Sequence, residues 1–189
     1  MLPWGTDFVA PDGTGLPAFS GRLYDVAGAM AIYGNQAVGT DPGAITMAAV
    51  QDITTPPDQV VQGIVGGLGG VSYVGLAVRA GAPGSGNGYW WLGTLGFAEF
   101  GVLAAGVFAV LGVTGNFVGG DALMIQAQGA SLRCYINGAL DSTFVDGTYP
   151  AGMGGLCGFR DDHVSGLLSL RVSSLFPAPA FMPSFVPGV

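Results

Sequence analysis

The sequence predicts an all-β fold of short antiparallel strands, and three observations support this prediction. Glycine and proline are abundant, with 35 Gly and 12 Pro in 189 residues, and both disfavour helix interiors. Lysine is absent and Glu99 is the only glutamate, so two strong helix formers are almost missing. Short apolar runs recur with a turn signal between each pair, a pattern typical of a sandwich or a barrel.

The apolar runs predict about a dozen strands, in a single domain over residues 1–173. Residues 1–16 are expected to form an N-terminal segment, and Pro56-Pro57 excludes a central strand at that point. Asn137-Gly138 between two alternating runs predicts a tight hairpin turn. The expected strands are Met30–Tyr33, Gln36–Val38, Ala44–Val50, Gln59–Val65, Val71–Arg79, Tyr89–Leu92, Phe97–Leu103, Val107–Val113, Asp121–Gln128, Ser131–Ile136, Ala139–Val145, Leu156–Phe159 and Ser165–Ser173.

Charge is sparse and one-sided. Charged residues make up 9% of the chain, all five cations are arginine, and the formal net charge is −7. Nucleic acids and anionic membrane surfaces both select clustered Lys and Arg, so we expect neither as a partner. A chain with so few charges is expected either to enter a membrane or to cover much of its surface with something other than solvent.

Residues 89–113 form a long apolar stretch that resembles a membrane span. A transmembrane helix needs about 20 apolar residues without a central charge. Glu99 lies in the middle of this stretch, and glycines recur every few residues. We therefore expect strands separated by turns and no membrane span. The first residues lack the basic and apolar regions of a secretory signal peptide, and we expect none.

Residues 120–159 carry motifs of a known kind of sandwich. A "G-D-x-L" strand opening is followed by a "G-x-x-L-x-x-Y-x-N-G" hairpin and a "D-x-T-Y-x-x-G-x-x-G-L" stretch. The matching residues are Gly120, Asp121, Leu123, Gly129, Leu132, Tyr135, Asn137, Gly138, Asp146, Thr148, Tyr149, Gly152, Gly155 and Leu156, with Asp7-Phe8, Asp12-Gly13, Gly75-Leu76, Arg79 and Gly88-Tyr89 upstream. In these motifs the chain resembles the concanavalin A-like, laminin G-like family from about residue 7 to about residue 173.

The resemblance implies a two-sheet antiparallel jelly-roll sandwich. The family includes lectins, glycoside hydrolases, adhesion modules and virus-borne proteins, so it fixes no function. Its hydrolases resemble one another in a Glu-x-Asp-x-x-Glu strand, which a chain with Glu99 as its only glutamate cannot contain. We therefore expect no enzymatic activity and no cofactor, and we interpret Glu99 as a solvated strand charge.

Two local clusters are candidate contacts for a glycan or a protein partner. Tyr89-Trp90-Trp91 follows a glycine-rich loop, and alternation on a strand predicts one Trp in the core and one facing outward. The outer ring would stack on a sugar or anchor an interface, or be covered by a loop or subunit. Asp161-Asp162-His163 would contact calcium or sugar, or form a polar turn; we expect no metal, because calcium needs six to eight oxygens.

The last residues, 174–189, alternate prolines with large apolar side chains and carry no charge. Proline at this density blocks helix and ladder pairing, so we expect an extended arm. Uncharged apolar surface usually marks an interface, and we expect the arm to dock on another subunit; packing on its own domain is the alternative. The proposed assembly residues are Leu175, Phe176, Phe181, Met182 and Phe185.

These observations leave two functional hypotheses. The first is a structural virion protein, a bacteriophage head decoration or a tail or fibre component, assembled in the host cytoplasm with copies of itself or with capsid or tail protein. This step rests on the resemblance to virus-borne members of the family. The alternative is a carbohydrate-binding module that attaches to surface glycans. Cys134 and Cys157 are expected to be either small buried thiols or a disulfide.

Overall fold

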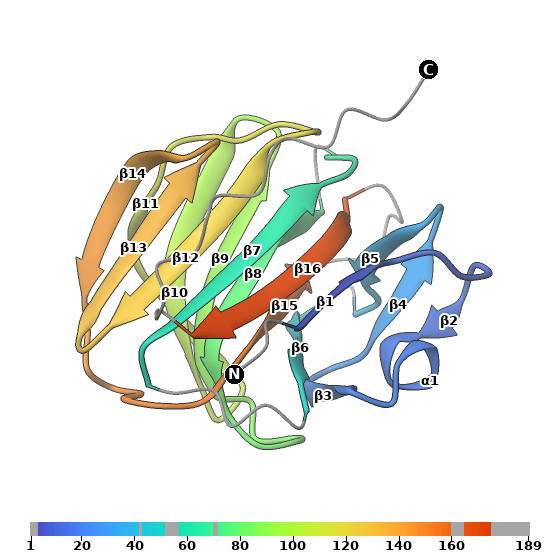
Figure 1. The fold of residues 1–189 in the computed structure, drawn as a ribbon, viewed down its shortest axis with the longest axis horizontal. Coiled ribbons are helices and arrows are strands. Elements are labelled where there is room, and N and C mark those ends of the chain that lie inside the picture. Colours follow the sequence, from blue (N-terminus) through green and yellow to red (C-terminus); the bar gives the residue numbers. More distant parts are fainter. Residues whose placement is uncertain (1–3, 42, 52–56, 70–71, 160–164, 175–189) are drawn as a thin grey trace.

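The computed structural model describes residues 4–41, 43–51, 57–69, 72–159 and 165–174, which form a β-sandwich of two antiparallel sheets (Figure 1). In sheet A the order is β14-β13-β12-β7-β16-β5-β4-β2, with β1 alongside β16; in sheet B it is β11-β10-β9-β8-β15-β6-β3. Sheet A contains β1 (Trp4–Asp7), β2 (Thr14–Gly15), β4 (Met30–Tyr33), β5 (Gln36–Gly39), β7 (Gln59–Val65), β12 (Ala122–Gln128), β13 (Ser131–Ile136), β14 (Ala139–Val145) and β16 (Leu167–Ser174). Sheet B contains β3 (Leu23–Ala27), β6 (Ile45–Val50), β8 (Tyr73–Ala80), β9 (Gly88–Thr94), β10 (Phe97–Ala104), β11 (Val107–Val113) and β15 (Met153–Phe159). A short helix, α1, spans Leu16–Phe19.

The predicted all-β fold and its strands from Met30 onward are confirmed, with ends that differ by a few residues. The first 27 residues, which include the predicted N-terminal segment 1–16, also contain β1, β2, α1 and β3, none of which was among the expected elements. These elements are short, and β1 pairs with β16 at the far end of the chain. The residues next to these elements in the sequence therefore give little indication that the elements form.

The Asn137-Gly138 hairpin follows the predicted turn chemistry, and a second hairpin that was not predicted has the same turn geometry. Asn137 and Gly138 join β13 to β14 with φ of 50° and 84°, and Ala105 and Gly106 join β10 to β11 with φ of 49° and 80°. Positive φ at both central residues is the type I′ turn, whose twist matches that of the flanking strands. The apolar stretch 89–113 forms β9, β10 and β11, as predicted. No helix within the described ranges is long and apolar enough to cross a membrane.

Apolar side chains fill both the space between the sheets and the outer face of sheet B. Leu76, Trp91 and Leu123 belong to the core between the sheets, whereas Met47 and Trp90 belong to a second buried cluster on the other side of sheet B. Cys134 lies in the first cluster and Cys157 in the second, and both thiols are free. Of the two alternatives for the cysteines, the structure therefore shows buried thiols, and burial raises the pKa of each.

Candidate functional site

The outer face of sheet A carries the candidate site. Along β12 and β13, the apolar Leu123, Ile125, Leu132 and Cys134 point into the core, so the residues between them point to the opposite face. Strand register sets two rows across this face, Tyr135–Met124–Gln62–Arg171 and Arg133–Gln126–Val60–Ser173. The sheet A platform is defined by Gln62, Met124, Gln126, Arg133, Tyr135 and Arg171.

Hydrogen bonds between neighbouring strands hold the middle of the platform. The Tyr135 hydroxyl donates to Gln126 Oε1 at 3.0 Å, which fixes the half-buried ring beside Arg133. Gln62 Nε2 donates to Met124 Sδ at 3.4 Å, and Gln62 is almost fully buried. Arg171, at the other end of the row from Tyr135, is exposed. A strand spacing of ~4.8 Å places Tyr135 and Arg171 about 14 Å apart at the backbone.

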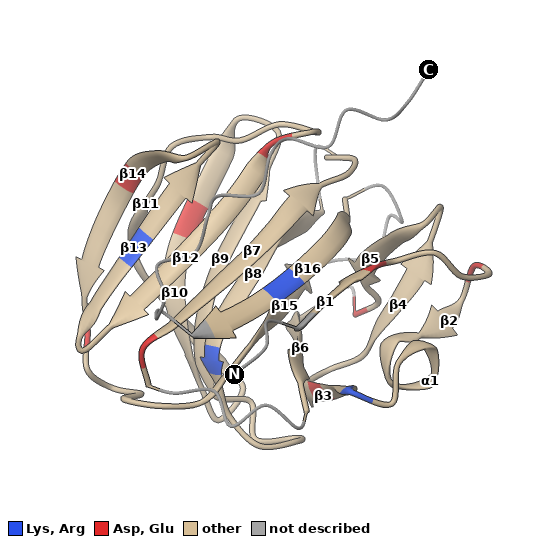
Figure 2. Cartoon of the chain, viewed as in Figure 1, with Lys and Arg blue, Asp and Glu red and all other residues tan. Residues whose placement is uncertain are grey.

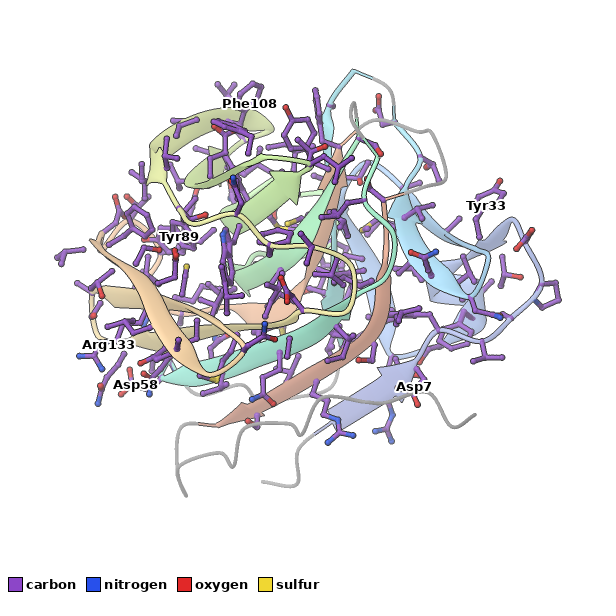
Figure 3. The ribbon with its side chains drawn as sticks, turned by 90° about the horizontal axis from the view of Figure 1, so that it is seen from above. Asp7, Tyr33, Asp58, Tyr89, Phe108 and Arg133 are labelled. Carbon is purple, nitrogen blue, oxygen red and sulfur yellow. The ribbon has the colours of Figure 1, made fainter. Side chains whose placement is uncertain are left out.

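The platform is locally cationic although the chain is acidic. The strands β7, β12, β13 and β16 contain two arginines and no aspartate or glutamate. Figure 2 shows the two blue segments on β13 and β16, and Figure 3 shows Arg133 projecting away from the sandwich. Within the described part of the chain, the ion pair is that of Arg79 with Asp58, and neither Arg133 nor Arg171 has a carboxylate within 4.0 Å. Among the described residues, both guanidinium groups are therefore without an ion-pair partner.

The platform was not predicted from the sequence, although the alternating pattern of β13 indicates part of it. Ser131, Arg133 and Tyr135 alternate with apolar residues, and the Asn137-Gly138 turn fixes their register against β14. Alternation places these three on one face, but their neighbours Met124 and Gln62 come from other strands. Only the pairing of β13 with β12 and of β12 with β7 brings this set together.

The aromatic cluster predicted to contact a glycan or partner is internal. The predicted alternation holds, because Tyr89 and Trp91 enter the core between the sheets and Trp90 points to the outer face of sheet B. However, all three side chains are 0% exposed, so of the two alternatives for the outer ring the structure shows the covered one, and none of the three rings is open to a ligand. Trp91 Nε1 donates to Thr114 Oγ1 at 2.9 Å, and the Trp90 ring meets Phe108 edge-on at 6.5 Å. The sequence predicted the faces correctly, but cross-strand packing covers both.

Tyr89 links β9 to the loop between β14 and β15. Its hydroxyl donates to Asp146 Oδ1 at 2.6 Å and accepts from the Tyr149 amide at 3.1 Å (Tyr89 lies inside the sandwich in Figure 3). Burial, followed by the hydrogen bond to Asp146, raises the pKa of Tyr89 to about 12. The bond to Tyr89 and the amide of Thr148 in turn hold the pKa of Asp146 below its usual value, against the effect of burial.

The raised pKa of Tyr89 predicts a loss of stability at high pH. A tyrosine in the unfolded chain ionises near pH 10, so the folded state binds more protons between pH 10 and about 12. This contribution is fully present below pH ~10 and is lost as the pH rises through 12. Melting temperatures from pH 8 to 12 should fall less steeply for Tyr89→Phe than for the native protein. Tyr24, whose pKa burial also raises, is present in both, so the difference isolates Tyr89; equal slopes would contradict the assignment.

The other predicted contacts, Asp161, Asp162 and His163, lie outside the described residues. So do the assembly residues Leu175, Phe176, Phe181, Met182 and Phe185, and the boundary at 174 stays a prediction. In the ranges that the structure covers, no group of three His, Cys, Asp or Glu side chains could hold a metal ion. Glu99 lies on the outer face of sheet B between Leu92 and Val113, and burial raises its pKa.

Arg79 is a buried cation whose role the sequence analysis did not identify. The residue is 1% exposed and has a φ of 53°. Its Nε and Nη2 donate to the Pro57 carbonyl at 3.1 and 2.9 Å, and Nη1 donates to the Tyr149 carbonyl at 3.2 Å. Asp58 is 4.0 Å from Nη2. One guanidinium thus joins the loop before β7 to the loop before β15, and its burial identifies it as structural.

Comparisons with known proteins define the fold. No family model and no curated protein matches the sequence. Similar solved structures include the carbohydrate-binding module CBM66 from Bacillus subtilis (TM-score 0.60, 15% identity, 81% of this chain and 92% of that one). Others are the Crh5 transglycosylase in complex with NAG (0.56, 11%, 93% and 85%) and the VIP36 exoplasmic/lumenal domain in its Ca²⁺/Man-bound form (0.52, 7%, 82% and 84%).

These structures confirm the predicted concanavalin A-like jelly-roll sandwich. At such low identity the likeness extends to the fold alone, and one fold supports many functions. One neighbour is a transglycosylase, so the expectation that this chain is not an enzyme stays a prediction.

Proposed function

We propose that the protein binds carbohydrate, and specifically an acidic glycan chain laid across the sheet A platform. The observation that carries this proposal is a half-buried tyrosine, Tyr135, on four strands that contain no carboxylate and two arginines, neither of which has an ion-pair partner among the described residues. The fold is shared with a carbohydrate-binding module and with a domain solved in a Man-bound form, which supports the proposal.

The platform supplies the two kinds of contact that a sugar acid needs. A tyrosine ring offers an apolar face to the C–H groups of a sugar and a hydroxyl for hydrogen bonding. Arginine forms paired hydrogen bonds with a carboxylate, and it is less strongly hydrated than lysine. Gln126, held against Tyr135, adds amide groups that can bond to sugar hydroxyls. Arg133, on the same strand and face as Tyr135, would contact an acidic unit of this chain.

Calorimetry with a polyuronate and a neutral glucan tests the proposal. We expect the native protein to bind the polyuronate more tightly, with an affinity that falls as salt screens the arginines. Tyr135→Ala and Arg133→Gln should each weaken binding by about tenfold, equivalent to ~1.4 kcal/mol. Arg22→Gln is the matched control, because Arg22 is exposed on the loop before β3 and lies off the platform.

Two outcomes would contradict parts of the proposal. If the neutral glucan bound equally well and Tyr135→Ala abolished this binding, the platform would be a carbohydrate site without a preference for acidic sugars. No binding of either polymer, or binding that Tyr135→Ala and Arg133→Gln leave unchanged, would exclude the platform as a glycan site.

A second candidate function is that of a self-assembling structural module. The observation that favours it is an open apolar edge of sheet B at β11, whose side chains are nearly all exposed. A bacteriophage particle as its location, and capsid or tail protein as its partner, stay predictions from the sequence.

A further inference from the structure

The strand β11 is an exposed apolar edge. It is the terminal strand of sheet B among the described residues, and its sequence VFAVLGV has no polar side chain. Five of its seven residues are among the exposed large hydrophobics, and Phe108 stands on the outer side of the sandwich in Figure 3. Natural edge strands are usually protected by Lys, Pro or inward-pointing charges. This strand has none of these, which indicates that another chain segment covers it.

Hairpin geometry shows which backbone groups of β11 are open. In a two-residue hairpin the residues flanking the turn, Ala104 and Val107, form a hydrogen-bonded pair, and bonded pairs then alternate along the ladder. Val102 and Ala109 therefore bond to each other, whereas Phe108 and Val110 turn their N–H and C=O groups away from β10. These groups can accept one more strand.

The other sheet edges are less suited to accept a strand. Beside β3, the loop after β8 already donates from the Gly84 amide to the Asp25 carbonyl at 3.1 Å and from the Gly86 amide to the Val26 carbonyl at 2.9 Å. The strand β2 has two residues, and β14 contains a carboxylate, Asp141, bound to the Gly115 amide at 2.9 and 3.0 Å. Among the described edges, β11 is the long and uncharged one.

The prolines of the C-terminal segment block ladder pairing along one edge of an extended strand but leave the other edge able to pair. Its prolines, Pro177, Pro179, Pro183 and Pro187, all occupy odd-numbered positions. In an extended strand, alternate residues direct their N–H and C=O groups to opposite edges. All four missing N–H groups would therefore lie along one edge. The even-numbered residues from 176 to 186 all keep their N–H donors, and these lie along the other edge. Proline with its nitrogen toward solvent is the arrangement found on edge strands.

We propose that residues 175–189 of one copy add to sheet B of a second copy as a strand along β11. Both strands are uncharged and apolar, so they bury hydrophobic surface without a charge penalty between chains of net charge −7. The proline-bearing edge then faces solvent and stops further strand addition. The proposal is independent of the glycan site.

The position of β16 favours a second copy over the same chain. β16 ends at Ser174, opposite Gln59, and the strands β7, β12, β13 and β14 separate it from the side of the sandwich on which β11 lies. Four strand spacings amount to about 19 Å. If all four prolines lie in the added strand, only residues 175 and 176 remain as a linker, and at ~3.3 Å per residue they are too short for that path. The contact joins unlike surfaces, so it is heterologous and generates a ring or an open chain of copies.

Full-length variants test the proposal through the proline pattern. Light scattering over a concentration series should give an oligomer for the native chain. Ala178→Pro with Ala180→Pro removes two donors from the pairing edge and should reduce the mass to that of the 19.0 kDa monomer. Ala178→Val with Ala180→Val, which keeps both N–H donors, is the matched control and should still assemble. On β11, Val110→Glu should also give a monomer, whereas Leu140→Glu on β14 should not; these residues are 48% and 56% exposed.

Each remaining outcome overturns the proposal. A monomeric native chain whose Phe108 and Val110 amides are protected from hydrogen exchange would place the arm on its own sandwich. An oligomer that survives Ala178→Pro with Ala180→Pro would exclude strand pairing by the arm. Loss of assembly in Ala178→Val with Ala180→Val as well would assign the contact to side-chain fit and not to a strand edge. Circular dichroism and melting temperature show that each variant is folded before its mass is interpreted.

Discussion

Arg79→Met should lower the free energy of unfolding by about 3 kcal/mol, because two buried carbonyls lose charge-assisted hydrogen bonds that are worth ~1.5–3 kcal/mol each. The guanidinium donates three times to Pro57 and Tyr149, and methionine fills similar volume without a donor. Burial lowers the pKa of Arg79, and removing this desolvated cation offsets part of the loss. Urea unfolding of the native and variant proteins measures the difference.

Arg79→Lys sharpens this test. Lysine keeps the charge, but its single ammonium group cannot reproduce the planar fork that bonds to two loops. We expect it to recover only part of the stability, while Arg22→Met on the exposed loop should change stability by less than ~0.5 kcal/mol. Native stability in Arg79→Met would show that the cost of burying the cation equals the value of its bonds.

Gly101→Ala should destabilise the protein by about 3 kcal/mol, the upper end of the usual cost of overpacking. The Trp90 ring lies across Gly101 on the neighbouring strand, and an added Cβ would meet Cζ2 and Cε2 of that ring and the Ala109 carbonyl oxygen. Trp90 is fully buried and the opposing carbonyl belongs to the backbone, so neither has room to move. Thermal unfolding followed by calorimetry measures the loss.

A double-mutant cycle tests whether the Trp90 ring causes this loss. Trp90→Phe shortens the ring, so Gly101→Ala should cost less in the Trp90→Phe protein than in the native one. Gly21→Ala is the control, because an added Cβ there meets nothing within 4 Å. Additive effects of Gly101→Ala and Trp90→Phe would exclude the ring and leave the Ala109 carbonyl as the cause.

Strands were predicted correctly where the residues of the strand and of its flanking turns are themselves the reason that the strand forms. Gln59–Val65, Val107–Val113, Ser131–Ile136 and Ala139–Val145 end in the structure where the pattern places them, because turn residues flank an apolar or alternating run. Asn137-Gly138 accepts positive φ at both positions and so fixes its hairpin. By contrast, β1 is a strand because β16 pairs with it, and no neighbouring residue encodes that contact.

The candidate site was predictable only in part. Alternation in Ser131–Ile136 shows that Arg133 and Tyr135 share a face, but the predicted aromatic contact was Tyr89-Trp90-Trp91, because exposed aromatic residues often mark binding sites. Exposure depends on what packs above a side chain, and for Trp90 this includes Phe108 from a strand two places along the sheet. A pattern along one strand cannot report that contact.

The all-β class, most strands, the tight turns and the lack of a paired-glutamate site can be predicted from residue type and from neighbours a few positions apart. The order of the strands, the burial of the rings and of Arg79, and the open sheet edge become visible only in the folded chain. Each of these depends on contacts between residues far apart in the chain. Such contacts form when the two sheets pack, and their energy belongs to the pair and not to either residue alone.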